Sequence, residues 1–163
     1  MKQTWIGIDP GVTGAFAILG EKISFFDMPT VLVASGKKHR NEYDAQAIVG
    51  FLSVLPGSLM VAIERQQAMP DQGVSSTFRT GYGFGMLIGI LAAMQIPYEL
   101  VAPVSWKRAL MPDMPKDKGA SIIKAKMLFP SAAPEMARKK DHARADALLI
   151  AEFARRRQLS LCR

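Results

Sequence analysis

Four side chains of the types that bind divalent metal ions occupy positions 9, 64, 142 and 146 of the 163-residue sequence. Asp9 and Glu64 each follow a short apolar run that predicts a buried strand, WIGI and LMVAI. His142 and Asp146 are four residues apart in a predicted helix, so they lie on one helix face. Three carboxylates converging near an imidazole would repel one another and be costly to bury without a positive partner.

A divalent cation removes this repulsion. Oxygen ligands combined with a single imidazole suit Mg²⁺ or Mn²⁺, whereas zinc sites contain more His or Cys. Two such ions about 3.5–4 Å apart can activate a water and stabilise the leaving oxygen in phosphodiester hydrolysis. Each residue alone also has an ordinary explanation, since a strand-end Asp forms turns and a helix-start His is often a surface residue. Their joint pattern favours the metal hypothesis.

The elements that would position these residues form an α/β pattern. We expect strands over 5–8, 14–19, 22–28, 59–63 and 97–102, with a loop over 29–43 that has a basic tip. We expect helices over 44–55, 77–95, 120–129 and 141–157, and a short helix that contains Trp106. Strands followed by alternating helices and strands predict a mixed five-stranded sheet flanked by helices. We expect one domain over 1–163.

Glycines recur every four residues in the predicted helix 77–95, at Gly81, Gly85 and Gly89. A glycine inside a helix costs up to about 1 kcal/mol relative to alanine, so close packing is expected to compensate for it. Packing against the sheet is the favoured interpretation, and contact with a second copy of the chain is the alternative.

Charge is concentrated in the last third of the chain. Residues 1–100 contain 7 Lys/Arg and 8 Asp/Glu, whereas residues 101–163 contain 14 and 6, which accounts for the net charge of +7. A basic region of this kind indicates a polyanionic partner, most often nucleic acid. The single cysteine, Cys162, fits a reducing cytoplasm, and the uncharged run 82–94 is too short to span a membrane.

The motifs together resemble those of a known nuclease family. GIDPG at 7–11, the strand that ends at Glu64, Trp106-Lys107, Lys116-Asp117-Lys118 and KKDHARADALLIA at 139–151 are similar to the RuvC-type Holliday junction resolvases, members of the RNase H-like superfamily. The similarity covers nearly the whole chain in the same order. The C-terminal helix is most similar to the phage and chloroplast-type branch.

The resemblance implies an RNase H-like fold and a metal-dependent endonuclease that acts as a homodimer. Such an enzyme cuts two opposing strands of a four-way DNA junction symmetrically and leaves 5′-phosphate ends. Asp9, Glu64, His142 and Asp146 match the family's metal-binding positions. Many members have Asp at position 142, so either Asp141 or His142 faces the metals; the four-residue spacing to Asp146 favours His142.

The resemblance also implies residues that contact DNA. Phe78 corresponds to an aromatic residue that wedges between bases at the junction, with Arg79 beside it, although Phe78 is also an ordinary candidate for the core. Phosphate contacts are expected from Lys107, Lys116, Lys118 and Lys124. The setting would be the cytoplasm of a bacterial or phage-infected cell.

Three alternatives remain at this point. The turn at 7–14 also resembles the phosphate loop of the actin and sugar-kinase superfamily, but those proteins need two such domains and this chain is too short. An RNase H-like nuclease that acts on RNA, flaps or forks would have the same acidic residues. A junction-binding protein without cleavage would be expected to lack one of them, and all four positions are occupied.

Overall fold

A five-stranded mixed sheet is the centre of the computed structural model, which describes residues 3–36, 38–115 and 117–161. The order of its strands is β3-β2-β1-β6-β7. β1 pairs with β2 and β2 with β3 in antiparallel fashion, whereas β1–β6 and β6–β7 are parallel. The predicted mixed sheet is therefore confirmed. Its strands are β1 (Gln3–Asp9), β2 (Ala15–Leu19), β3 (Ile23–Asp27), β6 (Ser58–Glu64) and β7 (Tyr98–Val101).

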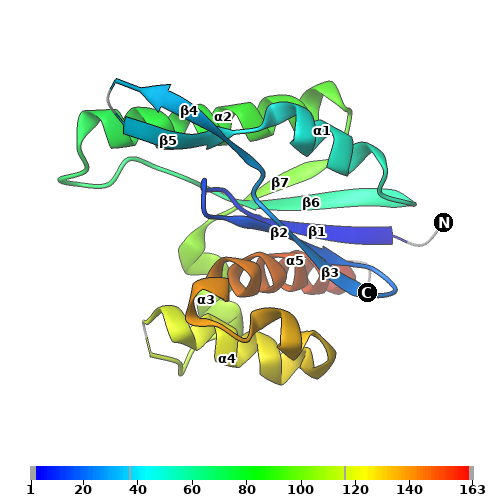
Figure 1. Cartoon of the computed structure of the whole chain (residues 1–163). Coiled ribbons are helices and arrows are strands. Elements are labelled where there is room, and N and C mark those ends of the chain that lie inside the picture. The colour runs from blue at the N-terminus through cyan, green and yellow to red at the C-terminus, as the bar shows by residue number, and fades with distance from the viewer. Residues whose placement is uncertain (1–2, 37, 116, 162–163) are drawn as a thin grey trace.

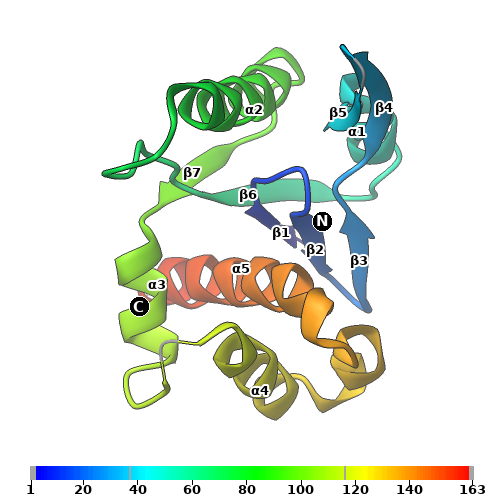
Figure 2. The same ribbon diagram turned by 60° about the vertical axis from the view of Figure 1, so that its left-hand side comes forward.

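Helices cover both faces of this sheet, as Figure 1 shows. On one face lie α1 (Ala45–Ser53) and α2 (Val74–Ala93). On the other lies α5 (His142–Leu161), with α3 (Pro103–Leu110) and α4 (Lys118–Leu128) packed around it, as the turned view in Figure 2 makes clear. Two short 3₁₀ helices, η1 (Pro130–Met136) and η2 (Lys139–Asp141), connect α4 to α5.

The alternation of side chains along the strands divides the core into two parts. Ile6 and Ile8 pack with buried residues of α1 and α2, whereas Trp5 packs with buried residues of α5. β6 alternates in the same way, with Ala62 in the part of the core that contains α5. Since successive side chains of a strand point to opposite faces, Asp9 and Glu64 share the α5 face with Trp5 and Ala62.

The segment 29–43, which we predicted as a loop, is instead a β-hairpin of β4 (Thr30–Ser35) and β5 (Lys38–Tyr43). β4 has an apolar sequence, TVLVAS, and β5 a polar one, KHRNEY, so neither strand alternates between apolar and polar residues as a half-buried strand would. The pairing depends on cross-strand hydrogen bonding and on anchoring to α2. The Arg79 guanidinium donates to the Asn41 carbonyl oxygen at 3.1 Å, and the Tyr43 ring occupies the space over Gly83.

The expectation that Gly81, Gly85 and Gly89 pack against the sheet was wrong. All three are exposed, and a Cβ added at any of them would meet no atom within 4 Å. The glycine of α2 that allows close packing is Gly83, which is buried against Tyr43. The outward face of α2 is therefore open at these three glycines.

The remaining element boundaries agree with the sequence to within a few residues. Asp44 caps α1 as expected, since its side chain accepts a hydrogen bond from the Ala47 N–H at 3.0 Å. α2 begins three residues earlier than predicted, and α4 begins just after Asp117, whose side chain caps it. Within the described part of the chain, no helix has the length and apolarity that a membrane crossing requires.

Candidate metal centre

Asp9 is the last residue of β1 and lies beside the end of β6. The register of the two parallel strands pairs Ile8 with Ile63, so the next residues, Asp9 and Glu64, end neighbouring strands at one edge of the sheet. The chain turns sharply after Asp9, with the Gly11 N–H donating to the Asp9 carbonyl oxygen at 3.2 Å. Both carboxylates are therefore fixed to the rigid sheet.

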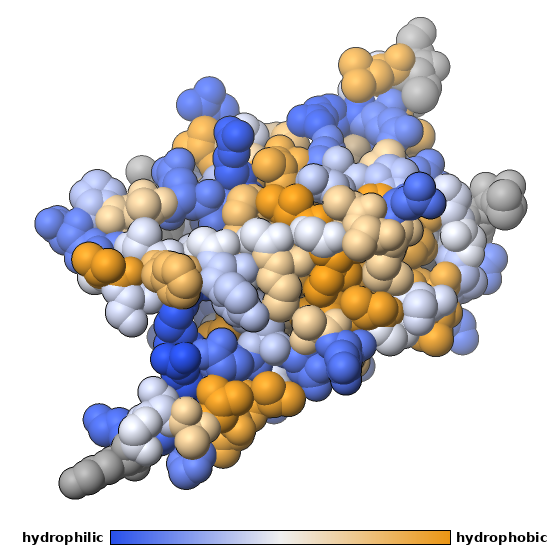
Figure 3. All heavy atoms as spheres, turned by 90° about the horizontal axis from the view of Figure 1, so that it is seen from above, coloured by the Kyte–Doolittle hydropathy of each residue, from blue (hydrophilic) through white to orange (hydrophobic). Residues whose placement is uncertain are grey.

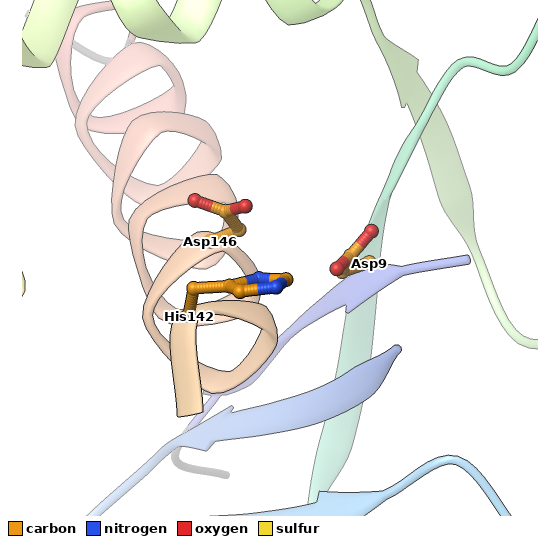
Figure 4. Close-up of side chains that lie close together, drawn as sticks. All are labelled: Asp9, His142 and Asp146. Atoms are coloured by element: carbon orange, nitrogen blue, oxygen red, sulfur yellow. The ribbon is translucent and has the colours of Figure 1, made fainter. Parts of the chain in front are cut away.

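α5 brings the other two predicted ligands to the same place. His142 and Asp146 lie on its first turns, and Figure 4 shows the His142 ring directed towards Asp9 with the Asp146 carboxylate beside it. One ligand atom of each of Asp9, His142 and Asp146 lies within 4.8 Å of those of the other two. Two carboxylates and one imidazole at this separation match the donor set that we predicted for Mg²⁺ or Mn²⁺. The three residues therefore fit a divalent cation.

The electrostatics of the site favour a positive partner as well. Burial, followed by the Asp146 and Glu64 carboxylates, raises the pKa of Asp9 to about 7, and only Lys107 opposes this among the principal causes. Burial is also the main reason that the pKa of Glu64 is raised. With a pKa of about 7, Asp9 is partly protonated at neutral pH, and a bound cation would restore its charge.

Glu64 belongs to the site but stands slightly apart from the three clustered residues. It contributes to the raised pKa of Asp9, yet it is not within the 4.8 Å group. Its Oε1 accepts a hydrogen bond from the Trp106 Nε1 at 2.8 Å, and its Oε2 lies 3.5 Å from the Gln66 Nε2. The carboxylate is thus oriented by α3.

The contacts of Arg138 distinguish Asp141 from His142. The buried Asp141 carboxylate accepts from the Arg138 backbone N–H at 2.8 Å and from its guanidinium at 2.8 and 3.1 Å. These hydrogen bonds hold the pKa of Asp141 below its ordinary value. Asp141 immediately precedes α5, as an N-cap would, but its side chain turns back to Arg138 and His142 faces the cluster.

A pocket of about 680 Å³ opens beside the cluster, and His142 and Asp146 form part of its wall. The rest of the wall comes mainly from α3 and from the loop that follows it. Lys107 and Arg108 provide its positive charge, and Val104 and Met111 are among its apolar residues. The site is therefore open to a large substrate on the basic side.

The predicted DNA contacts are distributed over three elements. Phe78 is 75% exposed on α2, so it is not a core residue. Arg79, beside it, is directed to β5 rather than to solvent. Lys107 lies near the acids, whereas Lys124 is half-buried on α4 and is not part of the pocket wall. Lys116 lies outside the described residues, and the side chain of Lys118 is likewise outside them.

Two supporting residues had no role in the sequence prediction. The Arg144 guanidinium donates to both Asp27 oxygens at 2.7 and 2.8 Å and to the Glu135 side chain at 3.1 Å, which ties the start of α5 to β3 and η1. Trp106 was noted only as part of a motif. The signal available in the sequence was its position next to Lys107. A tryptophan buried at that position needs an acceptor for its N–H, which pointed to a polar partner.

Comparisons with known proteins found one similar sequence and solved structures with a similar fold. No protein-family model matches the chain. The chain is 33% identical over 99 residues to the chloroplastic Holliday junction resolvase MOC1 of Chlamydomonas reinhardtii. That match covers 61% of this chain and 11% of the relative, so the chain spans about a tenth of the length of the curated relative.

Two solved structures of Thermus thermophilus RuvC share the fold. The first, in complex with a Holliday junction substrate, has a TM-score of 0.59 at 19% identity and covers 96% of both chains. The second has a TM-score of 0.54 at 21% identity and covers 97% of both. The resemblance read from the sequence motifs is confirmed, and the chain has the RNase H-like fold of RuvC.

Proposed function

We propose that this protein is a metal-dependent endonuclease that resolves four-way DNA junctions by cutting two opposing strands symmetrically and leaving 5′-phosphate ends. The observation that carries the proposal is the convergence of Asp9, His142 and Asp146 within 4.8 Å at one edge of a RuvC-type sheet. The 33% identity to a chloroplastic Holliday junction resolvase supports the choice of substrate.

The four predicted ligands would hold two Mg²⁺ ions, with Mn²⁺ as a substitute. When bound, the ions would supply an activated water and stabilise the leaving oxygen. The chain's own part is to fix the ligands on rigid elements, since Asp9 and Glu64 end strands and His142 and Asp146 share a helix. Lys107, which lowers the pKa of both Asp9 and Glu64, would attract the substrate phosphates to the site.

The DNA would extend from the metal centre towards α2. Phe78 and Tyr82 lie one turn apart on this helix and are 75% and 52% exposed. Aromatic side chains in this position can stack on bases where a junction opens. Lys107, Lys116, Lys118 and Lys124 would contact phosphates without regard to sequence. Arg79 would act indirectly, because its hydrogen bond to Asn41 holds the hairpin against α2.

A homodimer would place two such sites on opposite strands of a junction. Its most suitable interface is the outward face of α2, where Gly81, Gly85 and Gly89 leave open space. Viewed from this side, Figure 3 shows apolar and weakly polar residues across the middle of the surface and hydrophilic ones around them. Small residues allow two helices to approach closely, so burial there would compensate for the glycines' low helix propensity.

The proposal is tested by cleavage of a labelled four-way junction beside a matched duplex, a flap and an RNA–DNA hybrid, with Mg²⁺ or EDTA. Paired nicks in the junction alone, dependent on Mg²⁺, are expected. Equal or better cleavage of another substrate would retain the metal site but refute junction resolution, and binding without any cleavage would refute the nuclease. We propose a bacterial or phage-infected cytoplasm as the setting, which the single cysteine of the sequence supports.

A further inference from the structure

Trp106 is a buried tryptophan whose N–H points at a predicted metal ligand. Its side chain has 0% exposure and packs in the part of the core that contains α5. The indole nitrogen donates to the Glu64 Oε1 at 2.8 Å, across 42 residues of sequence. An indole N–H is a donor only, and leaving it without an acceptor in the core would cost about 1–3 kcal/mol. The ring and the carboxylate are therefore fixed to each other.

This hydrogen bond determines how Glu64 presents its carboxylate. Oε1 is taken by Trp106, while Oε2 has a long contact of 3.5 Å with the Gln66 Nε2. Without this hydrogen bond, the Glu64 carboxylate could rotate about its side-chain torsions. It would then lose conformational entropy when it binds an ion. Residues that hydrogen-bond to metal-binding groups in this way orient them and typically affect metal affinity or activity 10–100-fold.

Lys107, the next residue, interacts with the same tryptophan ring. Its Nζ lies 5.1 Å from the centre of the Trp106 ring, a cation–π distance. α3 thus delivers a neutral donor to Glu64 and, one residue later, a positive charge beside the acids. The same buried ring therefore donates to Glu64 and lies beside the Lys107 ammonium.

We propose that Trp106 is a positioning residue of the metal centre, which holds Glu64 through its indole N–H so that Oε2 is the oxygen offered to a divalent ion. The inference rests on the proposed metal site, but it concerns binding of the ion and not the DNA substrate. It assigns Trp106 no direct contact with the metal or with the substrate.

The first test is Mn²⁺ or Mg²⁺ binding to the DNA-free protein by calorimetry, comparing the wild type with Trp106→Phe. Phenylalanine keeps most of the ring and removes the N–H. The matched control is Trp5→Phe, which makes the same change at the second buried tryptophan of the same part of the core. Trp106→Phe is expected to weaken ion binding 10–100-fold. Trp5→Phe is expected to change it less than twofold.

Equal affinities in the two variants would refute the positioning role and leave the metal site intact. A wild type that binds no divalent ion would refute the metal site itself. Cleavage provides a separate readout, since excess Mg²⁺ should restore most of the activity of Trp106→Phe. A wild type that binds ions but does not cut junctions would refute the proposed function and leave this inference standing.

A second measurement uses the native core and so does not depend on Trp106→Phe folding. The chain has two tryptophans, which give two indole N–H signals in a ¹⁵N-correlated NMR spectrum. The signal that remains in Trp5→Phe belongs to Trp106. It is expected to shift when Mg²⁺ is added to the wild type and to move to a different position in Glu64→Gln. An unchanged Trp106 signal at saturating Mg²⁺ would overturn the proposal.

Discussion

Gly7 of β1 lies directly against the backbone of Ala147 in α5. A Cβ added to Gly7 would overlap the Ala147 carbonyl oxygen and would lie 2.7 Å from the Ala151 nitrogen. These are backbone atoms of a buried helix, so no side chain can move aside to make room. The close approach brings α5 against the sheet two residues before Asp9. The missing side chain at position 7 therefore sets the distance between the strand-borne and helix-borne ligands.

Gly7→Ala is accordingly expected to destabilise the protein by about 3 kcal/mol, because overpacking a core typically costs 1–3 kcal/mol and here the helix itself must move. Urea denaturation measures the change. Gly50→Ala on α1 is the matched control, since a Cβ there meets nothing within 4 Å. It should raise stability by up to about 1 kcal/mol. Similar results for the two substitutions would show that α5 can shift away from β1 at little cost.

Much of this site was predictable because strand ends and helix spacing are local properties of the sequence. Asp9 and Glu64 follow apolar runs, and the four-residue spacing of His142 and Asp146 places them on one helix face. The sheet and its helices followed from the same patterns. The resemblance to resolvases supplied the order in which these pieces belong together.

The features of the structure that the sequence did not predict depend on contacts between distant segments. The hairpin at 30–43 combines an apolar strand with a polar one, and its strands form because they pair with each other and attach to α2 through Arg79 and Tyr43. The hydrogen bond from Trp106 to Glu64 spans 42 residues and has no periodic signal. The glycines of α2 were misjudged for a related reason, since periodicity identifies a helix face but not what lies opposite it.

The pKa of Asp9 predicts how the stability of the metal-free protein depends on pH. The folded-state value of about 7 lies above the ordinary value of 3.8, so the folded protein binds more protons than the unfolded chain between these values. Stability is therefore expected to fall as the pH rises from 4 to 7. Asp9→Asn cannot ionise, so in EDTA at pH 8 it should be about 2–4 kcal/mol more stable than the wild type.

Chemical denaturation in EDTA at pH 4.5 and pH 8 measures this difference. Mg²⁺ should stabilise the wild type at pH 8 but not Asp9→Asn, because a ligand stabilises only the state that binds it. The same substitution should abolish junction cleavage and leave junction binding nearly unchanged. A stability difference that does not depend on pH would contradict the electrostatic explanation.

Arg144 is expected to hold the start of α5 through a pH-dependent ion pair. Its hydrogen bonds keep the pKa of Asp27 below the ordinary value of 3.8, so this stabilisation is present above that value and is lost as the pH falls through the folded-state pKa. The Asp27 side chain is 64% exposed, which limits the coupling to about 0.5–1 kcal/mol. A double-mutant cycle of Asp27→Asn and Arg144→Met should give this value at pH 7 and a progressively smaller one as the pH falls below 3.8 and through the folded-state pKa of Asp27. A coupling that persists in acid would contradict it.

The open face of α2 predicts the effect of a large side chain on the oligomeric state. Gly85→Arg introduces a long, charged group where the monomer has open space, so the fold should be retained. A dimer that uses this face should dissociate. Light scattering with size-exclusion chromatography should give a dimer for the wild type and for Gly50→Arg, and a monomer for Gly85→Arg. A variant that remains dimeric would place the interface elsewhere.

Substitution of Phe78 distinguishes a role in opening the DNA from a role in stabilising the fold. Because its side chain is 75% exposed, Phe78→Ala should change the free energy of unfolding by less than about 0.5 kcal/mol. Stacking of a base on an aromatic side chain contributes about 1–3 kcal/mol, which corresponds to a loss of roughly 5- to 150-fold in junction cleavage. Val54→Ala is the control, since Val54 is 77% exposed just after α1.

Fluorescence of a 2-aminopurine base at the junction centre should rise on binding of the wild type, in Ca²⁺ to prevent cleavage, and should rise less with Phe78→Ala. This readout distinguishes unstacking from a general loss of affinity, because Lys107 and the other cations still bind phosphate in the variant. If Phe78→Ala cleaves the junction as fast as Val54→Ala, the exposed ring has no part in opening the DNA. The Phe78 ring, exposed in the single chain, would then be buried against a second copy of α2 in a dimer. The Gly85→Arg experiment tests this independently.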